Sequence, residues 1–424
     1  MNNDFPYPRR SEWLRAAYWA GPPLFCLLVY YWGLRAWYQQ DDFVWLAQRF
    51  HARKLGDFLR VVFGPSVHGT FRPLSERLFL LLAGKYFGAD AFPARLLVFG
   101  TQTASILLLA SLVRRLTNSA AAGFIAPVIW VANGALAFPM AWSSSYMYIL
   151  CGFCLLLAFH FFERYMATGK RSAYYLQWAV FLSGFLVMET TIVYPAIAAA
   201  YALLRARKYF LRTLPLFGAS LLFLVLNTLL VPKQRTGAYA LHFDGSVGKA
   251  LITYWNWLLV PPKWEGWARW HVQPWVGTAL VVVFTIAILA WAVYDYWRGS
   301  RLAVFGLVVF LILLAPVLPL SQHVSYYYLT LPSMGLAFVG ASAVAAGSSR
   351  PARAPAWALI GIFLLVQAPF AYTACQWWYE RSQRIRSIVT GVTAYHQSVP
   401  DKMLVLTDVD EGTLDSVFWD GGFR

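Results

Sequence analysis

Long apolar segments recur along almost the whole chain and are separated by short polar connections. A helix needs roughly 20 apolar residues to cross the hydrocarbon core of a bilayer. Eleven segments meet or approach this length: 18–37, 93–113, 120–139, 145–162, 173–187, 190–204, 213–231, 275–294, 302–319, 327–346 and 355–373. Charged residues make up only 13% of the chain, against about 25% in soluble domains. We therefore predict an all-α polytopic membrane protein with about eleven transmembrane helices.

Basic residues in the short connections predict the orientation, because cytoplasmic loops collect Lys and Arg. With a cytoplasmic N-terminus, the cytoplasmic loops hold Arg114, Arg115, Arg164, Lys170, Arg171, Arg205, Arg207, Lys208, Arg212, Arg298, Arg301, Arg350 and Arg353. The loops 38–92 and 232–274 and the tail 374–424 then lie outside the cytoplasm. We expect a transmembrane domain over 1–373, and the modest length favours a bacterial inner membrane. The first apolar segment is expected to be a retained span, because no cleavage site follows it.

Composition and motifs exclude several classes of function. The net charge is +16, but no basic low-complexity tract or binding module indicates nucleic acid. Cys26, Cys151 and Cys154 fall in predicted spans and Cys375 stands alone, so no disulfide framework is expected. The spacing of Cys151 and Cys154 is typical of redox pairs, but an apolar span favours a packing role. Nucleotide-binding and zinc motifs are absent from the sequence.

Asp41 and Asp42 form an acidic pair at the exit of the first span, in a chain with only 19 acidic residues. Residues 43–62 carry apolar residues at helical spacing with basic residues between them, which predicts an amphipathic interfacial helix. A second helix is expected over 73–87. The pair could simply cap the first of these helices. A second acid at a lipid boundary is costly without a partner or a function, however, which favours a chemical role.

Five stretches resemble the C-type (GT-C) membrane glycosyltransferases. They are the acidic pair 41–42, the F-R-P-L element at 71–74, the segment 85–97, the acidic turn 188–191 and the aromatic element 323–335. The last two are similar to elements in relatives of the protein O-mannosyltransferases. The resemblance spans roughly residues 18–346, and all five stretches fall on the outer face that the charge argument assigns or at its boundary.

The resemblance implies transfer of a sugar from a polyprenyl-phosphate donor to an acceptor at the outer face, with inversion at the anomeric carbon. Asp41, with Asp42 beside it, is the expected general base. Arg72 is the expected ligand of the leaving phosphate, since its planar guanidinium suits phosphate oxygens. Other expected contacts to the donor or substrate come from His68, Glu189, Lys233, Arg235, His323 and Tyr327.

Alternative roles remain open for these residues. Arg72 could snorkel at the interface or pair with Asp41 or Glu76, and Glu189 could cap the next helix. His323 could be a boundary histidine, and the tyrosines at 326–328 an aromatic belt. Many GT-C relatives carry another acid in the second outer loop, but residues 141–146 have none. A divalent metal held by the acidic pair is a further alternative, since hard cations favour carboxylate oxygens, but it is not favoured, and no metal ligand is assigned.

Two other functions compete with the enzyme. A transporter or flippase of lipid-linked solutes would suit many spans, but the paired repeats typical of transporters are absent from the sequence. A non-catalytic membrane scaffold within an assembly would explain the missing acid of the second loop. The sugar, and whether the acceptor is a protein, a lipid or a glycan, stay open. In the tail, residues 402–407 have the pattern of a short strand.

Overall fold

The computed structural model of the chain describes residues 12–64, 70–231, 237, 239–263, 269–346, 350–400, 407 and 409. Within these ranges every regular element is a helix, which confirms the all-α class. The strand expected at 402–407 lies outside the described residues, apart from Thr407.

Among the described residues, five helices are long and apolar enough to cross a membrane: Phe92–Thr117, Ser143–Thr168, Arg207–Leu230, Pro274–Trp297 and Ala354–Ser398. The count becomes six if the pair Ala120–Ala132 and Gly134–Ala141, bent by 59°, forms one broken span. Shorter apolar helices cover Leu302–Val317 and Ser333–Ala346. Length and composition thus support an integral membrane protein, whereas the count of eleven spans is not confirmed.

The N-terminal part holds the first apolar segment and the segment 38–92 that follows it. Its elements are α1 (Glu12–Val29), α2 (Tyr31–Arg35), α3 (Asp42–Ala47), η1 (Gln48–Phe50), α4 (Leu55–Phe63), the π-helical turn η2 (Pro73–Leu78) and α5 (Phe79–Phe87). The amphipathic helix expected over 43–62 is therefore broken into α3, η1 and α4. The helix expected over 73–87 has the predicted bounds, although its first turn is wider than an α-helix.

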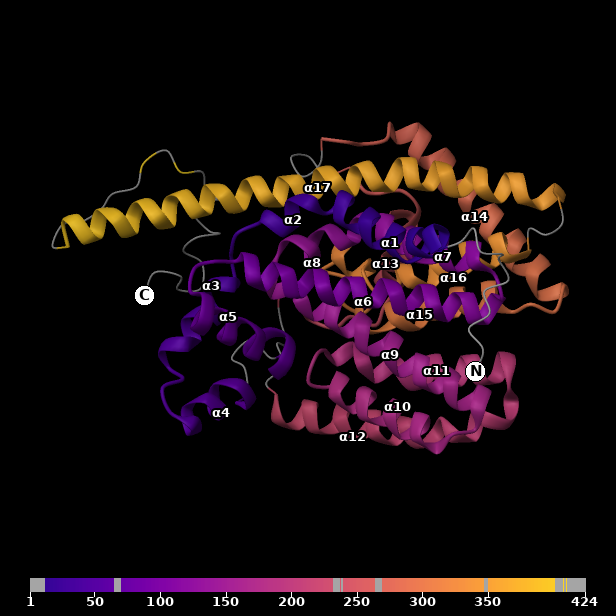
Figure 1. The fold of residues 1–424 in the computed structure, drawn as a ribbon, viewed down its shortest axis with the longest axis horizontal. Coiled ribbons are helices and arrows are strands. Elements are labelled where there is room, and N and C mark those ends of the chain that lie inside the picture. Colours follow the sequence, from indigo (N-terminus) through magenta and orange to yellow (C-terminus); the bar gives the residue numbers. More distant parts are fainter. Residues whose placement is uncertain are drawn as a thin grey trace.

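The central part begins with the long helix α6 (Phe92–Thr117), which contacts α7 and α9. The elements that follow are α7 (Ala120–Ala132), η3 (Gly134–Leu136), α8 (Ala137–Ala141), η4 (Ser143–Ser145), α9 (Tyr146–Thr168), α10 (Arg171–Gly184), η5 (Glu189–Val193), α11 (Tyr194–Arg205), η6 (Arg207–Arg212) and α12 (Leu214–Leu230). Figure 1 shows α10 and α12 on the side of the molecule opposite to α17.

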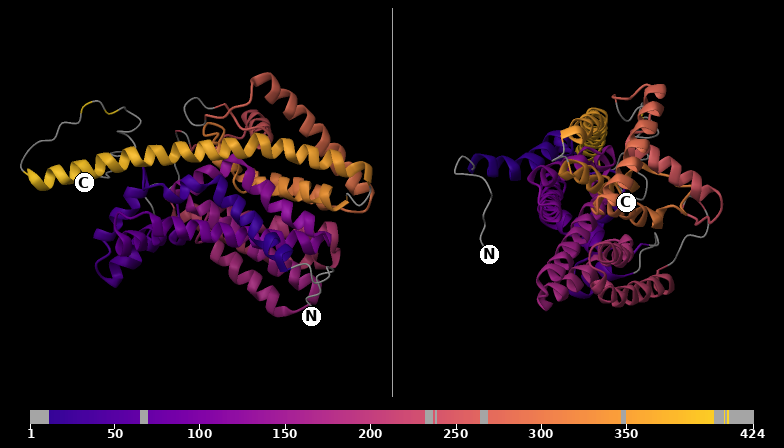
Figure 2. Two further views of the ribbon diagram at one scale, coloured as in Figure 1. Left: turned by 45° about the horizontal axis from the view of Figure 1, so that its top comes forward. Right: turned by 90° about the vertical axis from the view of Figure 1, so that its right-hand side faces the viewer.

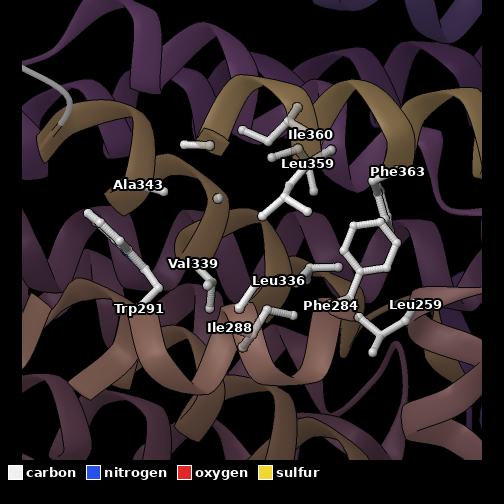
Figure 3. Close-up of a pocket in the computed structure, with 14 residues that line it drawn as sticks. Leu259, Phe284, Ile288, Trp291, Leu336, Val339, Ala343, Leu359, Ile360 and Phe363 are labelled. Atoms are coloured by element: carbon white, nitrogen blue, oxygen red, sulfur yellow. The ribbon is translucent and has the colours of Figure 1, made fainter. Parts of the chain in front are cut away.

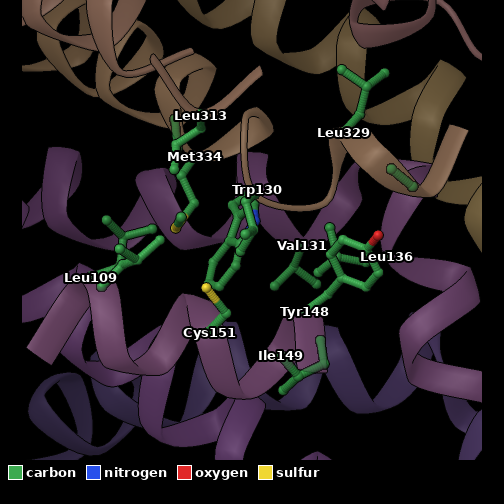
Figure 4. Packing of buried hydrophobic residues seen from close by; sticks show 14 of the residues in the cluster. Leu109, Trp130, Val131, Leu136, Tyr148, Ile149, Cys151, Leu313, Leu329 and Met334 are labelled. Carbon is green, nitrogen blue, oxygen red and sulfur yellow. The ribbon is translucent and has the colours of Figure 1, made fainter. Parts of the chain in front are cut away.

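A buried tryptophan marks the centre of this packing. Trp130 is fully buried among Leu109, Cys151 and Met334, which come from three other helices (Figure 4). Its indole N–H donates to the carbonyl of Thr330 at 2.9 Å. The buried ring of Trp130 and its indole hydrogen bond therefore join α7 to the segment that precedes α16 (Ser333–Ala346).

The C-terminal part contributes α13 (Ser246–Leu259), α14 (Pro274–Trp297), α15 (Leu302–Leu314), η7 (Ala315–Val317), η8 (Tyr326–Leu329), α16 and α17 (Arg350–Ser398). Helices α15 and α16 cross at Gly306 and Gly335, where a Cβ on either glycine would collide with the carbonyl oxygen of the other. The crossing therefore requires small residues on both helices, as is common between membrane helices.

Helix α17 is 49 residues long and contacts α1, α2, α7, α8 and α16. It runs along one side of the molecule, and its C-terminal end extends past α3 and α5 (Figures 1 and 2). The boundary expected between residues 373 and 374 falls inside this helix. The apolar run ends there, but the polar residues that follow are good helix formers, so the backbone continues without a break.

A small apolar cavity of about 90 Å³ lies among α14, α16 and α17. Phe284, Ile288, Val339 and Phe363 point into it (Figure 3). Its lining is apolar, and such cavities stay free of water. We assign it to imperfect helix packing.

Candidate functional site

The two acids of the predicted pair have different environments. The Asp42 side chain is fully buried, and its carboxylate accepts hydrogen bonds from the Ser144 N–H at 2.6 Å, the Ser144 hydroxyl at 2.7 Å and the Gln39 N–H at 3.0 Å. Asp41, next to it, is exposed. Gln40 adopts the left-handed conformation with φ of 50°, which lets the chain turn sharply between α2 and α3.

The simple capping interpretation is not what the structure shows. Asp41 occupies the N-cap position of α3, but its side chain makes no capping hydrogen bond. The Asp42 carboxylate accepts hydrogen bonds from Gln39, which precedes it, and from Ser144 in the loop 141–146. The loop 141–146, which lacks an acid of its own, therefore supplies two donors to the acid of the first loop.

Burial raises the pKa of Asp42 to about 6, and the nearby Arg95 and the donors from Ser144 and Gln39 oppose a larger rise. The carboxyl is therefore mainly ionised at neutral pH, in keeping with three hydrogen bonds that all point toward it. Arg95 is fully buried in the first turn of α6 and donates to the carbonyls of Ala36 at 3.1 Å and Trp37 at 3.3 Å. It holds the end of α2 beside the acidic pair.

Arg72 forms an ion pair that joins the segment 71–76 to the turn that carries Glu189. Its Nε donates to Glu189 Oε2 at 2.9 Å, and its Nη1 lies 3.9 Å from Glu76 Oε1. The Phe71 N–H also donates to Glu189, at 3.4 Å. Two acids were predicted as structural partners of Arg72. Glu76 forms the longer contact, and the carboxylate nearest to the guanidinium is that of Glu189 and not that of Asp41. Glu189 joins its own turn to the segment that carries Phe71 and Arg72, and its carboxylate does not serve as a simple cap of the next helix.

Backbone contacts fix these two segments against each other. The Leu74 N–H donates to the Leu186 carbonyl at 2.9 Å, and the Ser75 hydroxyl donates to the Val187 carbonyl at 2.6 Å. The start of η2 is thereby attached to the turn that carries Glu189. Arg77 from the same π-helical turn donates to the carbonyl of Gly64 and so fixes the end of α4.

The opposite charges of Arg72 and Glu189 favour the ionised form of each residue. Burial alone would lower the pKa of Arg72, but Glu189 and Glu76 reverse the effect and raise it. Burial would raise the pKa of Glu189, but Arg72 holds it below its usual value. The pKa of Glu76 is raised, mainly by burial. One guanidinium is thus shared between two carboxylates, and Glu189 holds it most closely.

Aromatic residues surround this pair. His323 Nε2 and the Tyr327 hydroxyl lie 3.0 Å apart, and the rings of His323 and Tyr239 are 4.5 Å apart between centroids. Burial raises the pKa of Tyr239, the charge of Asp41 raises it further, and Arg72 opposes the rise. Tyr239 is therefore close enough to the charges of Asp41 and Arg72 for each of them to influence its hydroxyl.

The three consecutive tyrosines do not form an exposed belt. Tyr326 and Tyr328 are 2% and 8% exposed. The Tyr326 hydroxyl donates to Gln367 on α17 at 3.1 Å. Tyr327 packs against Phe138 and Tyr148, with ring centroids 4.9 and 5.5 Å away. Of the three, Tyr327 is the one whose hydroxyl lies at hydrogen-bond distance from His323, and the Tyr328 ring packs against the His323 ring with centroids 5.9 Å apart.

Three of the predicted site residues, His68, Lys233 and Arg235, lie outside the described residues. Within the described part of the chain, no three His, Cys, Asp or Glu side chains come together as a metal site. A comparison with known protein families, curated proteins and solved structures finds no match for this chain.

Sequence reasoning missed Ser144, Arg95 and Tyr239. Arg95 lies in the segment 85–97 that carries the resemblance, and an arginine inside a predicted span is a signal that could have been used. Ser144 stands in a run of three serines, and nothing in the sequence distinguishes it from Ser143 and Ser145. Tyr239 stands in the long segment 232–274, in a stretch without a recognisable motif.

Proposed function

We propose that this protein is an integral membrane glycosyltransferase with a GT-C-like bundle of about eleven spans. It moves a sugar from a polyprenyl-phosphate donor to an acceptor at the extracytoplasmic face, with inversion. The observation that carries the proposal is the exposed carboxylate of Asp41 beside the buried, hydrogen-bonded Asp42, with Tyr239 in range of both Asp41 and Arg72. The proposal places the protein in a bacterial inner membrane, with a cytoplasmic N-terminus and an extracytoplasmic tail.

Asp41 acts as the general base. The acceptor hydroxyl attacks the anomeric carbon of the donor, and its proton passes to the Asp41 carboxylate. The bond between the anomeric carbon and the phosphate oxygen breaks, and the polyprenyl phosphate leaves with the electron pair. Base catalysis of this kind contributes roughly 10²–10⁴-fold to the rate. Asp42 has a positioning role, because its hydrogen bonds to Gln39 and Ser144 hold the turn that presents Asp41.

Arg72 stabilises the charge on the leaving phosphate. Its Nε is oriented by Glu189 at 2.9 Å, while the contact to Glu76 at 3.9 Å is loose enough for a phosphate to replace it. The Tyr327 hydroxyl and His323 supply neutral donors nearby. The acceptor is a protein, a lipid or a glycan whose hydroxyl reaches Asp41.

One observation favours a second function, that of a non-catalytic scaffold subunit in a membrane assembly. Both central charges have structural partners, since Asp42 is saturated by Ser144 and Gln39 and Arg72 is compensated by Glu189. A fold that kept its structural pairs after losing catalysis would have these features. In that case Asp41 would have no chemical role.

The purified protein, incubated with a radiolabelled pool of polyprenyl-phosphate sugars and membrane acceptors, tests the proposal. The wild-type protein is expected to transfer label, and Asp41→Asn to lose transfer by at least about a hundredfold while it stays folded. Asp57→Asn on α4 is the matched control, with the same change in the same outer segment. Transfer by Asp41→Asn at the wild-type rate would show that Asp41 is not the general base. No transfer by the folded wild-type protein would favour the scaffold function over the enzyme.

A further inference from the structure

A second polar cavity, of about 500 Å³, lies away from the Arg72–Glu189 pair, between the end of α2, the start of α6 and the C-terminal half of α17. Residues from three separate parts of the chain line it. The lining includes Arg35, Asp90, Tyr379, Gln383, Arg386 and Thr390. The cavity has both polar and apolar walls, whereas the small cavity near α14 has an apolar lining.

The ionisable side chains that line this cavity carry a net positive charge. Arg35 and Arg386 are both exposed, and among the described residues no carboxylate lies within ion-pair distance of either. The one acid in the lining, Asp90, accepts a hydrogen bond from the Phe92 N–H at 3.0 Å and so caps the start of α6. Two guanidinium groups against one engaged carboxylate favour an anionic ligand.

Arg35 is held in place before any ligand binds. Its guanidinium donates to the Tyr31 hydroxyl at 3.3 Å and lies 5.8 Å from the ring centroids of both Tyr31 and Tyr379. The Gln383 amide donates to the Arg35 carbonyl at 3.4 Å, which ties this residue to α17. Little side-chain freedom is then lost when Arg35 contacts an anion.

Aromatic side chains of α2 and α17 pack together beside the cavity. Trp32 on α2 packs against Tyr372 and Tyr379 on α17, with ring centroids 6.4 and 5.0 Å away. Trp and Tyr concentrate at the membrane–water interface, where their rings lie among the head groups. The apolar part of α17 ends in the same region, since the charged residues Glu380 and Arg381 follow directly.

We propose that this cavity binds the phosphate of a membrane phospholipid, with Arg35 and Arg386 on either side of the phosphate. The apolar wall, which includes Leu34 and Phe92, accommodates the start of the acyl chains. A lipid bound here bridges α2 and α17, which also meet through the hydrogen bond from the Trp37 N–H to Ser382 at 2.9 Å. This site is independent of the proposed transfer reaction and requires no catalytic activity.

Lipid binding to delipidated protein in a neutral sugar detergent tests the proposal. The probe is a short-chain phosphatidylglycerol, and bound lipid is counted by native mass spectrometry while the thermal unfolding midpoint is followed in parallel. We expect saturable binding of one lipid and a rise in the midpoint, with no rise for an uncharged diacylglycerol of the same chain length. We expect Arg35→Gln and Arg386→Gln each to weaken binding about fivefold. Arg384→Gln, an exposed arginine of α17 outside the cavity lining, is expected to bind like the wild type.

Four outcomes would overturn the proposal: wild-type affinity in the double variant of Arg35 and Arg386, equal weakening in Arg384→Gln, equal binding of the uncharged lipid, or full stabilisation by inorganic phosphate alone. The last would assign the cavity to a soluble anion.

If the double glutamine variant does not fold, the double lysine variant replaces it. We then expect affinity between the wild-type value and that of the single glutamine variants, since lysine keeps the charge but not the planar fork.

Discussion

Asp42 and Ser144 are 102 residues apart in the chain and share two hydrogen bonds, of 2.6 and 2.7 Å, inside the protein. This link separates the roles of the two acids at the start of α3. Asp42 holds the segment that precedes α3 against the loop 141–146, and Asp41 stays exposed beside it. Two adjacent carboxylates with such different surroundings can take different roles, one structural and one chemical.

Substitutions in the pair should separate activity from stability. Asp41→Asn is expected to abolish label transfer but to change the free energy of unfolding by no more than about 0.5 kcal/mol, because the side chain is exposed. Asp42→Ala is expected to lower both label transfer and the free energy of unfolding. The loss of stability is about 1–3 kcal/mol, because the buried donors of Ser144 and Gln39 are left without an acceptor. Transfer assays and denaturation in detergent measure the two effects. Equal loss of stability in both variants would contradict the division of roles.

The raised pKa of Asp42 predicts a pH dependence of stability. The folded protein holds this proton more tightly than the unfolded chain, so the stability contribution is full below the ordinary value of 3.8 and is lost as the pH rises to about 6. Above that pH the contribution is constant. Ser144→Ala removes one donor to the carboxylate and should move the upper end of this window to higher pH. Unfolding midpoints between pH 3.5 and about 8 test this, and an unchanged window would show that the hydroxyl does not influence Asp42.

The Arg72–Glu189 pair should be strongly coupled. Glu189→Gln leaves a mostly buried guanidinium with only its looser partner Glu76, and Arg72→Gln leaves two carboxylates without their cation. Each change is expected to cost about 3–5 kcal/mol, and the double variant less than the sum. Additive losses in the double-mutant cycle would mean that the pair contributes no coupling energy.

This pair also predicts a pH effect of the opposite sign. Because the pKa of Glu189 is lowered, its stabilising contribution is present above the ordinary value of 4.5 and is lost as the pH falls through the lower folded-state pKa. The stability difference between the wild type and Glu189→Gln should therefore be constant near neutral pH and shrink in acid. A difference that grew in acid would contradict the assigned direction.

The helix crossing at Gly306 and Gly335 should tolerate no added methyl group. Gly335→Ala places a Cβ against the Gly306 carbonyl and against Phe310, so we expect a loss of about 1–3 kcal/mol. Gly361→Ala on α17 is the matched control, because a Cβ there has no neighbour within 4 Å. We expect the control to be neutral or up to about 1 kcal/mol more stable. Comparable losses at both positions would show that the crossing is not specially close.

Local features of the chain were predictable in part. The helix over 73–87 has the expected bounds, and α1 with α2 covers the first apolar segment. The amphipathic pattern of 43–62 did not reveal that the chain breaks after Phe50, because apolar spacing continues across the break. The end of the apolar run at 373 did not mark the end of α17, since helix formation does not require apolar residues.

The sequence by itself determined an all-helical chain with segments suited to a membrane, because apolar content and run length are local properties that can be counted along the chain. It also singled out Asp41, Asp42, Arg72 and Glu189, since charges beside apolar segments are rare. Only the tertiary structure decided which of these side chains meet. The pairing of Arg72 with Glu189 joins positions 117 residues apart, and that of Asp42 with Ser144 joins positions 102 apart. Such contacts depend on how the helices pack against one another, and apolar periodicity carries no information about partners at that distance.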